Sequence, residues 1–302
     1  MKIAVIMGGD SPEKEISIKT GNALAAACRK LGHKVDLIKV GESIEPLIPV
    51  LKKVDLVVNA LHGGDGENGI VSGLLKQHGI AFTGSGQTAS ALCMDKHKSK
   101  TLVKNAGYLT PTWINIRRNT NYLSKLRETG NLGFPLVVKP NSEGSTLGLT
   151  INQNLKDLKD GIKLAFDHDS SVLIEKYIPG REITISILGQ EVLPIVEIVP
   201  VHEFYDYECK YSQGMSSYFC PAEINDILTG YIQKTALKIH NLLGCSHYSR
   251  VDFRLNGDKF WFLEVNTLPG MTETSLVPKA AEAAGYSFED LVEKIIQEAW
   301  SD

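Results

Sequence analysis

The segment from Arg250 to Asn266 constrains the fold most, because it has the pattern of a β-hairpin with one apolar and one polar face. Two runs rich in β-branched and aromatic residues flank Asn256-Gly-Asp, a turn sequence typical of hairpins. Since alternate residues of a strand point to opposite faces, a turn at 256–258 places the odd-numbered apolar side chains together. That register predicts Arg250 opposite Glu264, with Asp252 diagonally beside it.

The polar face of this hairpin carries three oxygen donors, Asp252, Glu264 and Asn266. Carboxylate and amide oxygens suit Mg²⁺, which commonly takes phosphate oxygens as further ligands. A solvated face with ion pairs has the same pattern, so the hairpin alone leaves both interpretations open. The loop that follows, residues 267–271, favours the ion, since its backbone N–H groups and Arg250 together provide a site for an anion.

Size and composition exclude several classes of protein. A chain of 302 residues fits two or three packed units, and 43% hydrophobic with 22% charged residues is typical of a soluble globular protein. A net charge of −3 gives no overall positive field for nucleic acid. We expect no membrane span or signal peptide, because the N-terminal apolar run is interrupted at Gly8 and no other run is long enough. Five scattered cysteines without a C-x-x-C pair argue against disulfides and zinc, and favour the cytoplasm.

Residues 1–86 are expected to form a first unit with a parallel sheet. Apolar strands at 2–7, 35–40 and 55–61 alternate with helical segments, which predicts a β-α-β-α-β succession. The loops at 8–17 and 62–69 follow strand ends, where ligands bind in such sheets. Neither loop is a complete phosphate-loop or dinucleotide fingerprint, and a glycine-rich connection without a ligand remains the alternative for the second.

Residues 87–180 are expected to form a second unit with a phosphate-binding loop. A helix is predicted at 88–105, and its lysines are expected on a solvated face. A strand then ends in Lys139, and small residues follow at 141–148. Backbone N–H groups of such a loop can surround phosphate oxygens while the ammonium neutralises charge, although an ordinary hairpin turn fits the loop equally well.

Residues 181–302 are expected to form a third unit that contains the hairpin. Glu175 and Glu182 precede the hairpin in the sequence, and their carboxylates could accept hydrogen bonds from the amino group and the sugar hydroxyls of a nucleotide. The backbone of residues 176–178 provides further donors and acceptors. The aromatic segment 203–222 has no clean periodicity, and we interpret it as a lid.

These motifs together resemble the ATP-grasp fold, and in detail the D-alanine–D-alanine ligase family. The similarity covers residues 2–296 and rests on several specific motifs: Gly8-Gly-x-Ser-x-Glu-x-Glu15-x-Ser, Leu61-His-Gly-x-x-Gly-Glu-Asn-Gly69, Met94-Asp-Lys96, Val138-Lys-Pro, Glu143-Gly-Ser-x-x-Gly148, Lys210-Tyr211, and Arg250-Val-Asp-Phe through Leu263-Glu-Val-Asn-Thr-x-Pro-Gly-Met-Thr-x-x-Ser-Leu276. The resemblance implies an α/β protein, with α+β character in the central and C-terminal parts, and an N-terminal parallel-sheet domain.

The resemblance also implies roles for individual residues. The ATP-binding set is Lys96, Lys139, Glu175, Lys176, Ile178 and Glu182. Two Mg²⁺ ions, or Mn²⁺ in their place, are expected to be bound by Asp252, Glu264 and Asn266. The catalytic set comprises Glu15, which binds the ammonium of the first D-alanine in a hydrogen-bonded group with Ser145 and Tyr211, and Arg250 and the Gly270 N–H, which stabilise an oxyanion. The substrate-side residues are His62, Lys210, Ser275 and Leu276.

The implied activity is ATP-dependent joining of two D-alanine molecules through an acyl phosphate, for peptidoglycan precursor synthesis, by a cytoplasmic homodimer. Alternatives are a D-alanine–D-lactate or L-amino-acid ligase of the same fold, and a nucleotide-binding protein without catalysis. Tyr211 favours the dipeptide, because a histidine at this position accompanies D-lactate use in the family. Partners other than ATP and D-alanine, nucleic acid and membranes included, are not expected.

Overall fold

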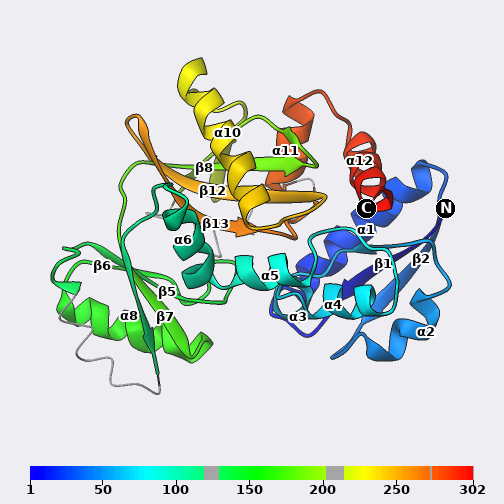
Figure 1. Cartoon of the computed structure of the whole chain (residues 1–302), viewed down its shortest axis with the longest axis horizontal. Helices are drawn as coiled ribbons and strands as arrows, with labels where there is room; N and C mark the ends of the chain where they lie inside the picture. The colour runs from blue at the N-terminus through cyan, green and yellow to red at the C-terminus, as the bar shows by residue number, and fades with distance from the viewer. Residues whose placement is uncertain (119–128, 202–213, 273, 302) are drawn as a thin grey trace.

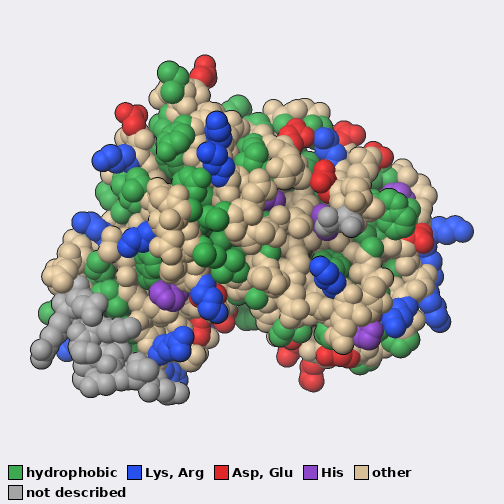
Figure 2. All heavy atoms as spheres, viewed as in Figure 1, with side chains coloured by type: hydrophobic (Ala, Val, Ile, Leu, Met, Phe, Trp, Pro, Cys, Tyr) green, Lys and Arg blue, Asp and Glu red, His purple; other side chains and the backbone are tan. Residues whose placement is uncertain are grey.

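The computed structural model describes residues 1–118, 129–201, 214–272 and 274–301. Three sheets, each with its own helices, occupy separate parts of the molecule (Figure 1). No helix within these ranges is long and apolar enough to span a membrane. Figure 2 shows acidic and basic side chains interspersed on the face in view, without one large positive area.

The N-terminal sheet is parallel, as predicted, with the strand order β2-β1-β3. Its strands are β1 (Lys2–Gly8), β2 (Lys34–Val40) and β3 (Leu56–Asn59). Strand β1 is central and nearly all buried, because helix α1 (Lys14–Lys30) packs against it. Beyond β3, Phe82 adds a single parallel bridge to Val57. Short elements complete this part: η1 (Glu45–Leu47), α2 (Ile48–Leu51), α3 (Gly64–Glu67) and α4 (Ile70–Gln77).

Two helices, α5 (Gln87–Met94) and α6 (Lys96–Asn105), lead from the N-terminal sheet towards the other two. The single helix predicted at 88–105 is therefore wrong in one respect. It breaks at Asp95, whose backbone is extended and whose side chain accepts a hydrogen bond from Lys98 N, so that Asp95 caps α6. This cap restarts the helix at Lys96 and so fixes the direction of its lysines.

The central sheet is antiparallel with the order β4-β7-β5-β6. Its elements are β4 (Trp113–Arg117), β5 (Leu136–Pro140), β6 (Thr150–Asn152), β7 (Ser171–Lys176) and helix α8 (Leu155–His168). Helix α8 buries Leu158, Ile162 and Phe166 against the sheet. The opposite face of the sheet is left for the cleft described below.

The C-terminal sheet has the order β11-β10-β8-β12-β13, with β9 added to β8. Its strands are β8 (Arg181–Leu188), β9 (Glu191–Val192), β10 (Val196–Pro200), β11 (Ser216–Phe219), β12 (Tyr248–Asn256) and β13 (Lys259–Asn266). Helix α10 (Asp226–Leu242) packs on this sheet in one hydrophobic cluster with residues of α5 and α6. Strand β11 lies within the segment predicted to be a lid, of which 202–213 fall outside the described residues.

The last two helices, α11 (Leu276–Ala283) and α12 (Phe288–Trp300), belong to the N-terminal core. Helix α12 packs on α1, and its buried residues join the cluster that contains β1. Two parts of the chain that are distant in sequence therefore share one core. The domain boundaries at residues 86 and 180 stay a prediction.

The hairpin register differs from the predicted one. Asn256 pairs with Lys259, so the turn contains two residues and not the three predicted. A bulge between Asp252 and Phe253 then shifts the register of the remaining pairs by one residue. Consequently Asp252 lies directly opposite Glu264, and Arg250 lies opposite Asn266. Phe260 and Phe262 face the core, whereas Trp261 and Leu263 are only partly buried. The prediction failed because a bulge shifts register without any signal in the alternation of side chains.

Candidate active site

A first cleft lies between the central and C-terminal sheets. Its walls come from β5, the loop 141–148, the connection from β7 to β8, and strands β12 and β13. All six residues of the predicted ATP set line it: Lys96, Lys139, Glu175, Lys176, Ile178 and Glu182. The lining combines apolar walls with a few charged groups, as is typical of a small-molecule site.

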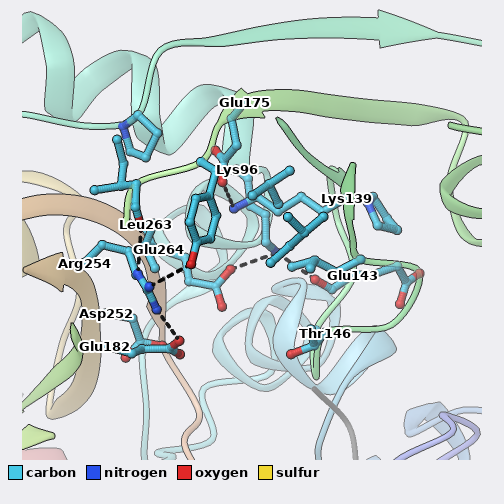
Figure 3. Close-up of a pocket in the computed structure, with 18 of the residues that line it drawn as sticks. Lys96, Lys139, Glu143, Thr146, Glu175, Glu182, Asp252, Arg254, Leu263 and Glu264 are labelled. Carbon is cyan, nitrogen blue, oxygen red and sulfur yellow. Dashed lines mark hydrogen bonds and ion pairs between the residues drawn. The ribbon is translucent and has the colours of Figure 1, made fainter. Parts of the chain in front are cut away.

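Glu175 contacts two lysines, Lys139 in the wall of the first cleft and Lys100 behind it, and Figure 3 shows the first of these pairs. Lys139 Nζ lies 2.6 Å from its Oε1 and Lys100 Nζ lies 2.6 Å from its Oε2, with all three side chains buried. Burial alone would raise the pKa of Glu175, but the two ammonium groups outweigh it and hold that pKa below its usual value. The group carries one excess positive charge, which suits a ligand with phosphates.

The two lysines respond differently to the same carboxylate. Burial lowers the pKa of Lys100 to about 8 despite its contact with Glu175. Burial also acts on Lys139, but the attraction of Glu175 and Glu264 outweighs it and raises that pKa. Lys139, which lines the cleft, therefore keeps its proton more firmly than Lys100, which lies behind it.

Lys96 joins the phosphate-binding loop to the hairpin. Its Nζ donates a hydrogen bond of 2.6 Å to the backbone oxygen of Glu143 and lies 3.2 Å from Glu264 Oε2 (Figure 3). The expectation of solvated lysines holds for Lys98 but is wrong for Lys96 and Lys100, both buried. Because Asp95 caps α6 at its start, the helix face that carries Lys96 and Lys100 points into the interior.

Asp252, Glu264 and Asn266 lie together on adjacent strands β12 and β13. Within the described ranges, no group of three or more His, Cys, Asp and Glu side chains is arranged to hold a metal ion. The hairpin offers two carboxylates and an amide, and Mg²⁺ commonly binds one or two carboxylates together with phosphate oxygens. The donor set therefore fits Mg²⁺ or Mn²⁺, and two of its members, Asp252 and Glu264, line the first cleft.

Neighbouring groups orient these donors. Thr184 Oγ1 donates to Asp252 Oδ1 at 2.5 Å, and Arg250 donates to both oxygens of Asp252 at 2.9 Å. The backbone N–H of Leu268 donates to Asn266 Oδ1 at 2.9 Å. Carboxylate and amide oxygens can accept further bonds or a cation, so these contacts fix directions without using all the lone pairs.

A second cleft adjoins the first and faces the N-terminal sheet. The residues that line both are Lys96, Glu143, Gly144, Arg250 and Glu264. Its remaining walls come from α1, the loop 62–67, and the segment 265–276. At this shared wall, a ligand bound in the first cleft would lie next to a ligand bound in the second cleft.

Glu13, not Glu15, occupies the position predicted for the substrate-binding glutamate. Ser145 Oγ donates a hydrogen bond to Glu13 Oε1, and the Glu13 side chain is buried in the wall of the second cleft. A Cβ on Gly63, whose φ is +63°, would lie 2.9 Å from Glu13 Oε2, so glycine is needed there. Glu15 is exposed and is not among the residues that line either cleft.

Helix geometry explains this correction. Ser17 and Thr20 are buried on the inner face of α1, and Glu13 lies four residues before Ser17, on the same face. Glu15 is two residues from Ser17 and therefore points away. In the first turn of the helix its charge interacts favourably with the helix dipole. The sequence held this signal in the spacing of residues 13, 17 and 20.

His62 is buried in the wall of the second cleft. Its Nε2 lies 3.1 Å from Thr20 Oγ1, and its Nδ1 lies 3.6 Å from Glu67 Oε1. The two contacts fix the imidazole ring between α1 and the glycine-rich loop, which places it beside the segment containing Gly270.

The remaining predicted substrate residues divide into two groups. Gly270, Ser275 and Leu276 line the second cleft. Ser275 Oγ accepts a hydrogen bond of 3.0 Å from Thr272 N, which closes the loop before α11. Lys210 and Tyr211 lie outside the described residues, so their predicted roles stay predictions.

The loop between the two clefts has a strained backbone. Ser145 and Thr146 have φ angles of +50° and +63°, which residues with side chains rarely adopt. Both residues line a cleft, Thr146 the first and Ser145 the second. Strain of this kind persists where surrounding contacts enforce it and is often found at functional sites.

Comparison with known proteins identifies the family. Residues 102–297 match the family model described as the D-ala D-ala ligase C-terminus. The chain is 43% identical to the D-alanine–D-alanine ligase of Syntrophotalea carbinolica over 98% of its length and 95% of the relative's. It is 42% identical to that of Clostridium botulinum, over 99% and 98%. The chain belongs to the D-alanine–D-alanine ligase family.

Solved structures of this ligase family share the fold. The D-alanine–D-alanine ligase of Bacillus anthracis complexed with ATP matches with a TM-score of 0.90 and 38% identity, over 100% of this chain and 98% of that one. The VanG D-Ala:D-Ser ligase of Enterococcus faecalis matches with a TM-score of 0.85 and 31% identity, over 99% of both chains. The ATP-grasp fold predicted from the sequence is confirmed.

Two residues that matter to this ligase-family site were missed by sequence reasoning. Lys100 was interpreted as a solvated helical lysine, yet it is fully buried against Glu175. Arg254 has no role among the residues predicted from the sequence, yet it lines the first cleft. The four-residue spacing between Lys96 and Lys100, which places both on one helix face, was the available signal for the first.

Proposed function

We propose that this chain is an ATP-dependent ligase that joins two D-alanine molecules to D-alanyl-D-alanine, releasing ADP and phosphate, for peptidoglycan precursor synthesis. The observation that carries the proposal is the meeting of two clefts at Lys96, Arg250 and Glu264. Full-length relatives at 42–43% identity with this name support the same reaction.

The first cleft accounts for binding of ATP. The excess positive charge on Glu175, Lys139 and Lys100 favours the phosphates, and the loop 141–148 supplies backbone N–H groups. Glu182 lines the same cleft and offers a carboxylate to the ribose hydroxyls. Mg²⁺ held by Asp252, Glu264 and Asn266 would supply further neutralisation of phosphate charge.

The second cleft accounts for the first D-alanine. The buried carboxylate of Glu13, oriented by Ser145, would bind its ammonium group. The substrate carboxylate would then face the shared wall, where its oxygen attacks the γ-phosphorus and ADP leaves. This transfer gives an acyl phosphate, whose carbonyl carbon an amine can attack, unlike that of a free carboxylate. Lys96 and Lys139 would hold the phosphates in place during the transfer.

The amine of the second D-alanine would attack the acyl phosphate, forming the peptide bond and releasing phosphate. Arg250 and the Gly270 N–H line the second cleft and would stabilise the oxyanion of the tetrahedral intermediate. Lys210, Ser275 and Leu276 would bind the second substrate, and Tyr211 would complete the group containing Ser145. Closure of the segment 203–222 would exclude water from the acyl phosphate.

We also propose a cytoplasmic homodimer, on the basis of the family resemblance, and the absence of any C-x-x-C pair in the sequence supports the cytoplasm. Mn²⁺ in place of Mg²⁺ is proposed because the same oxygen donors accept both ions.

The test is phosphate release with ATP, Mg²⁺ and D-alanine as the only amino acid, with the product identified by its mass. We expect D-alanyl-D-alanine and one phosphate per dipeptide. L-Alanine alone should give no product, whereas D-alanine mixed with D-lactate or D-serine separates dipeptide synthesis from the two related activities. No ATP consumption with any of these substrates would overturn the proposal, and a mixed product that exceeds D-alanyl-D-alanine would reassign the second substrate.

A further inference from the structure

Arg254 links the two sheets that enclose the first cleft. It lies on β12, and its guanidinium points into the cleft beside Glu182 (Figure 3). The chain passes from β7 to β8 through residues 177–180, which we call the connector. The connector joins β7 of the central sheet to β8 of the C-terminal sheet. Two of its residues, Tyr177 and Ile178, line the first cleft.

The guanidinium of Arg254 contacts the connector at both ends. Its Nε donates to the Ile178 carbonyl at 3.2 Å and its Nη2 donates to the Gly180 carbonyl at 2.7 Å. Its carbon also lies 5.7 Å from the centre of the Tyr177 ring. A planar fork with five N–H donors can hold several acceptors in fixed relative positions, which a lysine cannot do.

The same guanidinium orients Glu182, the proposed ribose ligand. Arg254 Nη1 lies 3.3 Å from Glu182 Oε2, and both side chains are mostly buried, with 14% and 19% exposed. The two residues are directly paired across β8 and β12. The carboxylate is therefore held by a partly desolvated, charge-assisted contact, which is stronger than an exposed ion pair.

The connector backbone is pressed closely onto β12. Gly180 has a φ of +117°, and a Cβ there would lie 2.2 Å from the Leu255 carbonyl oxygen. The N–H groups of Lys176 and Tyr177 are bonded to Thr112 O and Pro135 O. Among the described residues, none accepts a hydrogen bond from the Ile178 N–H, and Ile178 is one of the residues that line the cleft. This N–H is thus available to a base.

We propose that Arg254 is a positioning residue that sets both the affinity and the base selectivity of the nucleotide site, by fixing the connector and Glu182. The proposal rests on the proposed function, because it requires ATP in the first cleft. Adenine and guanine present opposite donor and acceptor patterns on the edge that a fixed backbone would contact. A rigid connector rejects guanine by leaving buried groups unpaired, and a loose one adapts to it.

The test compares Arg254→Met with Arg181→Met. Arg181 is a matched control because it lies at the start of β8 and donates to Glu197 at 2.7 and 2.6 Å and to Glu223 O at 2.9 Å. It does not line the first cleft. Both changes remove one guanidinium and its hydrogen bonds beside the connector. Binding of ADP and of GDP with MgCl₂ is measured by calorimetry, and turnover is measured by phosphate release with D-alanine.

For Arg254→Met we expect the Kd for ADP to rise about tenfold, as for the loss of one charge-assisted hydrogen bond. The ratio of the GDP Kd to the ADP Kd should fall at least about threefold, and kcat at saturating ATP should stay within about twofold. Arg181→Met should change each quantity by less than about twofold. Arg254→Lys keeps the charge but not the fork, and should recover part of the ADP affinity and none of the base selectivity.

The ratio of the two Kd values does not depend on the fraction of folded protein, so poor folding of a variant leaves the test intact. Equal ratios for the native protein, Arg254→Met and Arg181→Met would overturn the inference. A failure of the native protein to bind ADP at all would instead overturn the proposed function.

Discussion

Replacing Glu175 with glutamine tests the electrostatics of the first cleft. Each of its carboxylate oxygens contacts one buried ammonium group at 2.6 Å, that of Lys100 or that of Lys139. Glu175→Gln keeps the shape of the side chain and removes the negative charge between them. Removing one partner of a buried ion pair typically costs about 3–5 kcal/mol. We expect the free energy of unfolding to fall by about that amount at pH 7.

The pH dependence of this loss makes the test specific to Lys100. In the native protein burial lowers the pKa of Lys100 to about 8, although Glu175 opposes the shift. Without Glu175 that pKa falls further, so Lys100 is neutral at pH 7 in the folded variant and charged in the unfolded chain. Because the unfolded chain then binds one more proton, the free energy of unfolding of the variant rises by about 1.4 kcal/mol for each unit of pH increase, up to the unfolded pKa of lysine.

Between pH 7 and pH 8 the free energy of unfolding rises by this full amount only in the variant. It rises less in the native protein, because Lys100 there keeps much of its proton in the folded as well as in the unfolded state. The difference in stability between the two proteins should therefore shrink by about 1 kcal/mol over this interval. Between pH 8 and pH 9 Lys100 of the native protein also loses its proton, so the difference should shrink by only about 0.4 kcal/mol more and then stay constant.

Urea denaturation at pH 7, 8 and 9 without nucleotide measures these free energies. Glu197→Gln is the control, because Glu197 accepts bonds of 2.7 and 2.6 Å from Arg181 in a partly exposed pair. Its loss should be at most about 1 kcal/mol and should not change with pH. An equal loss at pH 7 and pH 8 for Glu175→Gln, or a loss no larger than that of the control, would refute the reasoning.

Three further predictions concern Glu264, Glu13 and His240. Glu264→Gln should lower phosphate release with D-alanine by about 100-fold or more, and unchanged turnover would contradict an ion at the hairpin. Glu13→Gln should raise the KM for D-alanine at least about tenfold while Glu15→Gln changes it less than about twofold, and the reverse ranking would restore Glu15 to the site. Burial, with a smaller contribution from His247, lowers the pKa of His240 to about 4. Since the unfolded chain then binds more protons, stability should fall by about 3 kcal/mol as pH drops from 6.5 to about 4. His240→Gln should remove this part of the decline in denaturation measured at pH 7 and pH 4.5, and parallel declines in both proteins would contradict it.

Much of the fold was predictable because local patterns determine it. Apolar runs separated by helical segments predicted the parallel N-terminal sheet, and alternation around Asn256-Gly-Asp predicted the C-terminal hairpin. The lining of the first cleft was also foreseen, since Lys139 and Glu175 stand at the ends of strands and the loop 141–148 follows directly. In each case the signal depends on residues that are close in the sequence.

The details of the site were decided by contacts between distant segments. Glu13 and Glu15 have the same chemistry, and only the packing of α1 against the N-terminal sheet turns one inwards and the other to solvent. Lys100 is buried because a carboxylate from β7 reaches it. A long charged side chain is solvated by default, and it becomes buried only where the rest of the fold brings a partner of opposite charge.

The sequence by itself therefore determined the kinds of elements, their order, and most of the groups that meet in the two clefts. Tertiary structure alone decided the bulge that places Asp252 opposite Glu264, and the contact of Arg254 with the connector. The physical reason is that turn chemistry and side-chain periodicity act over a few residues. Register across strands and the burial of charge depend instead on partners that are distant in the chain, as Arg254 is 76 residues from Ile178 and Ser145 is 132 residues from Glu13.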